Sequence, residues 1–137
     1  KEYINTILKV KSNVDSGMYL PVQEAAIAAL NNDDAWHELR NQEYKKRRTF
    51  AYAIMDALAC VYDKNQIGMF LWAKIPDTFK HVEELTEKIL HEADVFITPG
   101  FIFGSKGERY VRISLCSPEA DLKEALNRIM KMVNNNK

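Results

Sequence analysis

The chain has 137 residues, which is enough for one domain with a sizeable buried core. Its 19 basic residues balance its 19 acidic ones, so no overall field attracts nucleic acid or anionic lipid. Hydrophobic residues make up 47% of the sequence and charged residues 28%, as in an ordinary soluble globular protein. No apolar run approaches the roughly 18 residues needed to span a membrane. We therefore expect neither a nucleic-acid nor a membrane partner.

The cysteines and histidines exclude two further classes of site. Cys60 and Cys116 have no CxxC spacing and no disulfide framework, which favours a reducing compartment, the cytoplasm. We expect both thiols to be buried or half-buried, with no base placed to make either a nucleophile. The three histidines, His37, His81 and His91, are too scattered to form a metal site.

The N-terminal stretch predicts two helices and a turn. Tyr3, Ile4, Ile7 and Leu8 recur at helical spacing, which predicts a helix over residues 3–12. Because helical spacing starts almost at the first residue, and that residue is not methionine, the sequence favours a piece of a longer protein. A turn-rich stretch over residues 12–17 precedes an alanine-rich helix with Pro21 in its first turn.

A long helix is predicted next, from Ala35 to Tyr62, with Asp33 or Asp34 as its N-cap. At 1.5 Å per residue it would be about 40 Å long, the width of a domain of this size. The basic run over residues 44–50 spreads around this helix. It therefore predicts a solvated face and scaffold rather than a nucleic-acid footprint.

The C-terminal part alternates strands and helices. We expect a strand over residues 67–76 with both faces apolar and covered, a helix capped by Asp77, a short strand over residues 95–100 and a strand over residues 110–116. Ser117 and Pro118 favour the start of the last helix. This order predicts an α/β two-layer sandwich, with helices on one face of a small mixed sheet, plus the long spine helix. The other sheet face lacks helices, which indicates a missing neighbour.

Arg112 lies in the middle of the last predicted strand. Alternation places Val111, Ile113 and Leu115 on one face and Arg112 on the other. Alternation alone favours a solvated arginine or half of a structural ion pair. The alternative is a binding role, because a guanidinium can hold a carboxylate or phosphate through two parallel hydrogen bonds. The glycines just before this strand fit turns and match no phosphate-binding pattern.

The segment PGFIFGSKGERYVRIS, residues 99–114, resembles a signature of the class I/II (fold type I) pyridoxal-phosphate aminotransferases, the aspartate aminotransferase family. The matching residues are Pro99, Gly100, Phe103, Gly104, Gly107, Glu108, Tyr110, Val111, Arg112, Ile113 and Ser114. DSG followed by PVQEAAIAAL with Gln23, EYKKRR and GMFLWAKIP are similar to further family segments in the same order. The resemblance thus covers most of the chain.

The resemblance implies a C-terminal small domain over residues 21–137, preceded by residues 1–20 from the large-domain side. Arg112 would bind the substrate α-carboxylate, with Phe103 near the cleft and Gly100 letting backbone pass close to it. The full-length protein would transfer an amino group between an amino acid, aspartate-like or glutamate-like, and a 2-oxo acid. The small domain of this family also moves when substrate binds, so Arg112 would link binding to closure.

The cofactor implied by the resemblance is pyridoxal 5′-phosphate (PLP), held mainly by the large domain of a homodimer. Its Schiff-base lysine would lie upstream of Lys1, so this chain contains no catalytic residue and should be inactive alone. Lys106 follows a serine as in the aldimine motif but sits in the wrong context. Ser16 and Gly17 would touch the cofactor phosphate region across the dimer; the alternative is a plain loop whose side chains bond its own backbone.

Two other functions are consistent with the same residues. One is a non-catalytic α/β module that binds a carboxylate through Arg112. The other is a fold type I PLP enzyme that catalyses elimination or cyclisation. Trp72 also has two interpretations, a core anchor or, because it shares a strand face with Lys74, a residue lining the cleft.

Overall fold

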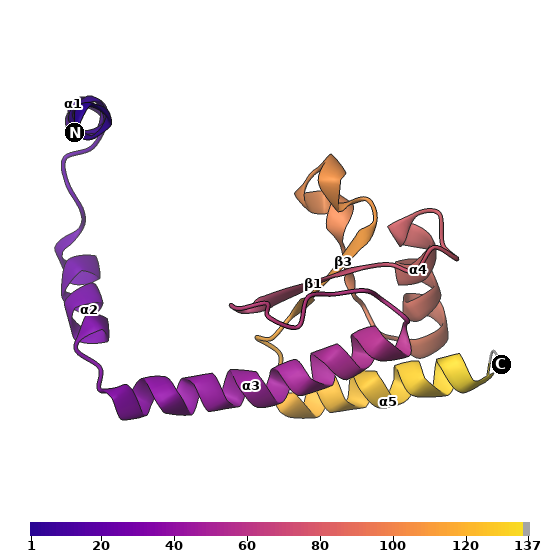
Figure 1. Ribbon diagram of the computed structural model, residues 1–137. Coiled ribbons are helices and arrows are strands. Elements are labelled where there is room, and N and C mark those ends of the chain that lie inside the picture. The colour runs from indigo at the N-terminus through magenta and orange to yellow at the C-terminus, as the bar shows by residue number, and fades with distance from the viewer. Residues whose placement is uncertain (136–137) are drawn as a thin grey trace. The chain divides into compact units, whose positions relative to one another are not determined.

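The computed structural model describes residues 1–135, which form two compact units (Figure 1). The first unit is Lys1–Leu39 and the second begins at Arg40. Helices α1 (Glu2–Val14) and α2 (Leu20–Leu30) lie in the first unit. Helix α3 (Asp34–Ala57) starts in the first unit and continues into the second, which holds every strand among the described residues. The units are described separately below.

The first unit exposes its apolar side chains. No residue of α1 or α2 is buried. Both helices form where they were predicted, and Pro21 lies in the first turn of α2. Asp33 is the predicted N-cap of α3, since its Oδ1 accepts a hydrogen bond from the Trp36 amide at 2.8 Å. The exposed apolar residues of α1 are Tyr3, Ile4, Ile7, Leu8, Val10 and Val14.

Helix α3 ends at Ala57, five residues before the predicted end at Tyr62. Ala59 has a φ of 54°, in the left-handed region, and this conformation stops the helix. The chain then turns toward the sheet. Val61 and Lys74 exchange two backbone hydrogen bonds, of 2.9 and 2.8 Å. The apolar pattern continues past the helix because Leu58 and Cys60 still pack into the core, although Val61 itself is 69% exposed.

The sheet has three strands in the order β1-β3-β2, and both pairings are antiparallel. The strands are β1 (Phe70–Lys74), β2 (Thr98–Pro99) and β3 (Tyr110–Ser114). The expectation of a mixed sheet is therefore wrong. Strand β1 is shorter than predicted because Gly68, with a φ of 87°, bends the chain before it.

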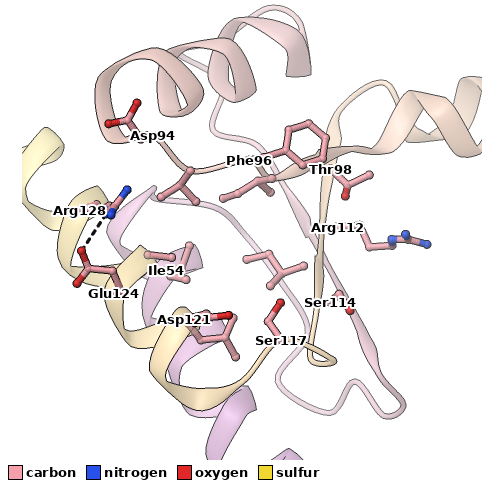
Figure 2. Close-up of a pocket in the computed structure, with 15 residues that line it drawn as sticks. Ile54, Asp94, Phe96, Thr98, Arg112, Ser114, Ser117, Asp121, Glu124 and Arg128 are labelled. Carbon is pink, nitrogen blue, oxygen red and sulfur yellow. Dashed lines mark hydrogen bonds and ion pairs between the residues drawn. The ribbon is translucent and has the colours of Figure 1, made fainter.

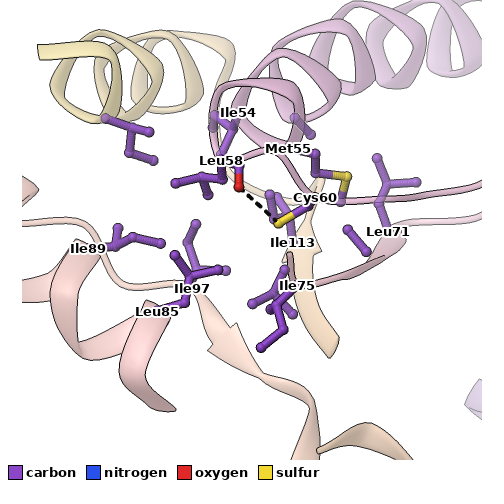
Figure 3. Packing of buried hydrophobic residues seen from close by; sticks show 14 of the residues in the cluster. Ile54, Met55, Leu58, Cys60, Leu71, Ile75, Leu85, Ile89, Ile97 and Ile113 are labelled. Carbon is purple, nitrogen blue, oxygen red and sulfur yellow. Dashed lines mark hydrogen bonds between the residues drawn. The ribbon is translucent and has the colours of Figure 1, made fainter. Parts of the chain in front are cut away.

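Helices α3, α4 (Val82–Ala93) and α5 (Glu119–Asn135) share one apolar cluster with one face of the sheet (Figure 3). Strands β1 and β3 contribute alternate residues to it, as the period of two requires. This confirms the two-layer α/β prediction. The cluster includes Ala51, Ile54, Met55, Leu71, Ala73, Leu85, Ile89, Val111, Ile113, Leu122, Ile129 and Met132.

The opposite face of the sheet carries the side chains that alternate with this core. Phe70, Lys74 and Tyr110 are exposed there, and Trp72 and Arg112 are half-buried. Within the second unit, helices α3, α4 and α5 pack on the other face only, so this unit does not itself cover both faces of β1. We call this surface the open face: Phe70, Trp72, Lys74, Tyr110, Arg112 and Ser114.

Arginine side chains hold several loops of this unit in place through hydrogen bonds. Asp77 does not cap α4, whose N-cap is His81; instead its Oδ1 accepts a hydrogen bond from Arg109 Nη2 at 2.9 Å. On α3, Arg47 Nη1 donates to the Leu115 carbonyl at 3.0 Å and Arg48 Nη1 to the Gln66 carbonyl at 2.6 Å. The basic run is scaffold, as expected, but these two side chains are tied to backbone carbonyls rather than solvated.

Strands β2 and β3 are joined by two short 3-10 turns, Gly100–Phe103 and Ser105–Gly107. A Cβ at Gly107 would lie 2.0 Å from the Gly100 carbonyl oxygen, and one at Gly100 would lie 2.7 Å from that of Tyr110. Both glycines are therefore required for the close approach of backbone to backbone.

No helix of the described residues is both long enough and apolar enough to cross a bilayer.

The two thiols should differ sharply in reactivity. Cys60 is buried, and burial raises its pKa to about 11, whereas Cys116 is exposed, contrary to the expectation of a buried or half-buried thiol. Because the thiolate is the reactive form, a disulfide reagent at about pH 8 should label Cys116 quickly and Cys60 only after denaturation. Mass mapping of the native protein measures this. Equal labelling of both cysteines would contradict the described burial.

Substituting Gly107 by alanine should destabilise the protein. The added methyl group has to displace the Gly100 backbone, and such overpacking costs about 3 kcal/mol. Urea unfolding followed by circular dichroism should show the loss. Ser105→Ala, on an exposed position of the same turn, is the matched control and should shift the midpoint little. A Gly107→Ala protein as stable as the wild type would show that the two turns do not pack this closely.

Candidate functional site

Arg112 lies at the centre of the open face. It is directly opposite Trp72 in the β1–β3 register, and Thr98 of β2 pairs with it on the other side. The alternation predicted from sequence is confirmed, since Val111 and Ile113 are buried while Arg112 projects from the other face. The structure therefore places a permanently charged group among aromatic side chains on a face that the described helices leave uncovered.

Two phenyl rings contact the guanidinium. The Arg112 Cζ lies 3.9 Å from the centroid of the Phe103 ring and 4.3 Å from that of Phe70. The electron-rich ring faces attract the cation, by about 0.5–1 kcal/mol at exposed sites and more where water is excluded. Phe103 was predicted near the cleft, and the structure brings it against Arg112. Phe70 was not singled out from sequence, although it makes the equivalent contact.

The donors of Arg112 are unused within the described part of the chain. Its Nε is buried and has no hydrogen-bond partner, and no carboxylate of residues 1–135 forms an ion pair with the guanidinium. A buried donor without a partner costs about 1–3 kcal/mol. The structural ion pair considered from sequence is therefore not made here. The arrangement leaves a half-buried guanidinium whose donors are free for the kind of planar anion that arginine can bind through two parallel hydrogen bonds.

Trp72 braces this arrangement from the sheet. Its ring meets that of Phe103 edge to face, with centroids 5.5 Å apart and an interplanar angle of 73°. A Cβ at Gly100 would come within 3.0 Å of Trp72 Cζ3, so the predicted site residue Gly100 serves to let the indole lie against the turn. Trp72 thus belongs to the open face rather than to the buried core, and it supports Phe103.

A cavity of about 500 Å³ adjoins this strand on the side toward α5. Its lining includes Arg112 together with Ile54, Asp94, Asp121 and Glu124. Figure 2 shows the Arg112 side chain pointing away from Asp94 and Glu124. Within the cavity wall, Glu124 Oε1 pairs with Arg128 Nε at 2.9 Å. Arg112 thus borders this cavity, while its guanidinium lies against Phe70 and Phe103 on the open face.

Ser16 and Gly17 belong to the first unit, in the loop between α1 and α2. Gly17 has a φ of 107°, and its amide donates to Asp15 Oδ1 at 3.3 Å. Asp15 also pairs with Lys11 at 2.8 Å, and that hydrogen bond lowers the pKa of its carboxyl group. These contacts are those of a loop that bonds its own backbone. An amide already bonded to a carboxylate is a poor phosphate donor in this state.

Lys106 and the candidate metal ligands lie apart from Arg112 within residues 1–135. Lys106 lies exposed on the second 3-10 turn, where no described group would activate it or hold a pyridine ring. Among residues 1–135 no three His, Cys, Asp or Glu side chains gather as metal ligands would. The described residues therefore present a guanidinium without a hydrogen-bond partner at Nε, supported by aromatic rings.

Comparison with known proteins gives the family. The model of the family "Aminotransferase class I and II" matches residues 1–129. Transaminase BacF of Bacillus subtilis (strain 168) is 36% identical over 133 residues, which are 96% of this chain and 33% of the relative. An LL-diaminopimelate aminotransferase of Oleidesulfovibrio alaskensis is 37% identical over 124 residues, 90% of this chain and 32% of the relative.

Solved structures agree. The apo structure of BacF matches with a TM-score of 0.75 and 35% identity over 95% of this chain and 33% of that one. An aromatic aminotransferase from Pyrococcus horikoshii matches with a TM-score of 0.69 and 29% identity over 84% of this chain and 31% of that one. The chain spans about a third of the length of the curated relatives it matches. By the match over most of its length, the chain belongs to the class I and II aminotransferases.

Proposed function

We propose that this chain is the C-terminal, substrate-capping domain of a PLP-dependent amino-acid aminotransferase, and that Arg112 binds the substrate α-carboxylate. The observation that carries the proposal is the guanidinium of Arg112, held between aromatic side chains with no counter-ion among the described residues. Family membership and the one-third coverage of the relatives support it. In this proposal residues 21–137 are the small domain, and residues 1–20 come from the large-domain side.

In this proposal Arg112 orients the substrate through its α-carboxylate. Its planar fork can donate two parallel hydrogen bonds to the two oxygens of one carboxylate. That pairing fixes both the position and the plane of the substrate's carboxylate, so binding energy is converted into alignment of the bond to be broken. Phe103 stacks on the guanidinium and helps to hold it in place. The same contact would link substrate binding to closure of the domain.

The cofactor and its lysine are assigned to residues outside this chain. PLP, when bound, supplies the electron sink on which amino-group transfer depends. This chain alone should therefore be inactive. Ser16 and Gly17 are proposed to approach the cofactor phosphate of the other subunit in a homodimer, which requires the Gly17 amide to leave Asp15. A cytoplasmic location belongs to the same proposal.

The proposed substrates are an amino acid and a 2-oxo acid. An aspartate-like or glutamate-like donor is the expectation from the family resemblance, with 2-oxoglutarate as acceptor. Several matched relatives are named LL-diaminopimelate aminotransferases, which is consistent with a donor that carries a second polar end. A donor screen with the full-length protein is the starting point for the measurements below.

Replacing Arg112 by lysine in the full-length protein should weaken the amino-acid donor by about a hundredfold in kcat/KM. Lysine keeps the charge but loses the bidentate geometry, and a charge-assisted pair in a dry site is worth a few kcal/mol. Steady-state kinetics measures the loss, and PLP content measured by absorbance should be unchanged. Arg128→Lys is the matched control, since Arg128 pairs with Glu124 away from the open face.

Three results would contradict the proposal at different points. If kcat/KM of Arg112→Lys stays within twofold of wild type, Arg112 is not the carboxylate-binding residue. If borohydride reduction of the PLP-loaded protein labels no lysine outside this chain, the enzyme assignment fails and a non-catalytic carboxylate-binding module takes its place. Turnover that needs no 2-oxo acid would instead indicate elimination or cyclisation.

A further inference from the structure

We propose that Phe70 is a positioning residue for the substrate carboxylate, because its ring orients the Arg112 guanidinium before any ligand arrives. The inference rests on the proposed carboxylate-binding role of Arg112 and goes beyond it by adding a residue on a different strand. The Arg112 Cζ lies 4.3 Å from the centroid of the Phe70 ring, close enough for a full cation–π contact.

The sheet register explains how the contact arises. Trp72 is directly opposite Arg112, and Phe70 is opposite Ser114, so Phe70 is the diagonal neighbour of Arg112 on the same face. Diagonal neighbours are within reach of aromatic and long side chains. Phe70 is 40% exposed and is not part of the buried core, so its ring packs against Arg112 rather than into the core.

No hydrogen bond within the described residues fixes the plane of the Arg112 guanidinium. Arg112 Nε is buried without a partner, and no carboxylate of residues 1–135 pairs with the group. An arginine side chain has several rotatable bonds, and a ligand that must order it loses affinity for that reason. The two ring contacts are thus the interactions that orient Arg112 in the absence of substrate.

The two rings are held in different ways. Phe103 lies on the 3-10 turn Gly100–Phe103 and depends on Trp72 for support. Phe70 is part of β1, which pairs along its whole length with β3. A group carried by a paired strand is positioned more precisely than one carried by a turn. Phe70 therefore supplies the fixed reference surface, and Phe103 closes against the group from the turn.

This arrangement also defines where a ligand binds. The face of a phenyl ring is electron-rich and repels an anion, whereas the guanidinium attracts it. With rings over the guanidinium, the oxygens of a ligand are directed to the terminal N–H groups at its edge. A carboxylate, whose two oxygens lie in one plane, matches that edge.

The test uses the full-length, PLP-loaded enzyme with Phe70→Leu and Phe70→Tyr, each alone and combined with Arg112→Lys. Binding of glutarate, which has the carboxylates of a glutamate-like donor but no amino group, is measured by calorimetry, and donor kinetics are measured alongside. We expect Phe70→Leu to raise the glutarate Kd and lower kcat/KM by about fivefold, as the loss of a partly exposed cation–π contact implies. Phe70→Tyr keeps the ring and should stay within twofold of wild type.

The double variant separates positioning from general structure. If Phe70 acts through the guanidinium, Phe70→Leu should change glutarate binding less than twofold once Arg112 is lysine. Phe101→Leu is the matched control: Phe101 is 39% exposed, lies on the turn Gly100–Phe103 and is not one of the two rings against Arg112. It should leave the glutarate Kd unchanged, and melting temperatures should confirm that all variants fold.

Three results would overturn the inference. Equal losses in Phe70→Leu and Phe70→Tyr would show that the ring face is not what matters. An equal loss from Phe70→Leu with arginine or lysine at position 112 would show that Phe70 does not act through Arg112. If the wild-type protein does not bind glutarate, Arg112 does not hold a dicarboxylate of this kind, and there is no carboxylate for Phe70 to position. Glutarate binding without amino transfer contradicts only the proposed function, and the Phe70 variants then decide the inference by binding alone.

Discussion

The guanidinium of Arg112 on the open face is the charge around which the second unit is arranged. A cation held against two phenyl rings, with its Nε buried and unpaired, is favourable only if something else completes its hydrogen bonding. Three features of the fold create that situation together. The antiparallel pairing of β1 with β3 brings Phe70, the turn after β2 brings Phe103, and the described helices cover only the other side of the sheet.

Stability and binding are assigned to opposite faces of the same strands. Val111 and Ile113 pack into the helix layer, and burial of such side chains contributes about 1.5–3 kcal/mol each. Arg112 between them contributes nothing comparable, because its side chain lies on the open face and its buried Nε has no hydrogen-bond partner. The loops around it are secured from elsewhere: Arg109 holds the segment after β1, and Arg48 holds the segment before it. The site therefore rests on a rigid frame without weakening the core.

Much of this could be predicted from the sequence, because it depends on local pattern. Alternation placed Arg112 on the other face of its strand from Val111 and Ile113. Helical spacing located the five helices of the described residues to within about five residues. The resemblance carried by residues 99–114 supplied the family, which the comparisons confirm. Phe103 and Gly100 came from that same segment, and the structure brings both to Arg112 or its supporting turn.

The rest could not be predicted, because it depends on pairing between distant segments. Nothing in the sequence states that Phe70 lies diagonal to Arg112, since that follows from the register of β1 against β3. The antiparallel direction of that pair was missed for the same reason. Asp77 looked like a helix cap, but Arg109, distant in sequence, competes for its carboxylate. The predicted end of α3 at Tyr62 was wrong. After Ala57 the apolar pattern continues, but Leu58 and Cys60 pack into the core from a loop, and Val61 forms a bridge with Lys74 of β1.

The central claim is that Arg112 is reserved for a substrate carboxylate rather than for a carboxylate of the protein. A crystal structure of the full-length, PLP-loaded enzyme with glutarate bound tests it most directly. The account predicts both oxygens of one glutarate carboxylate at about 2.7–2.9 Å from the Arg112 nitrogens, with the rings of Phe70 and Phe103 still against the guanidinium. Glutarate bound elsewhere, with Arg112 paired to an Asp or Glu from outside this chain, would contradict it.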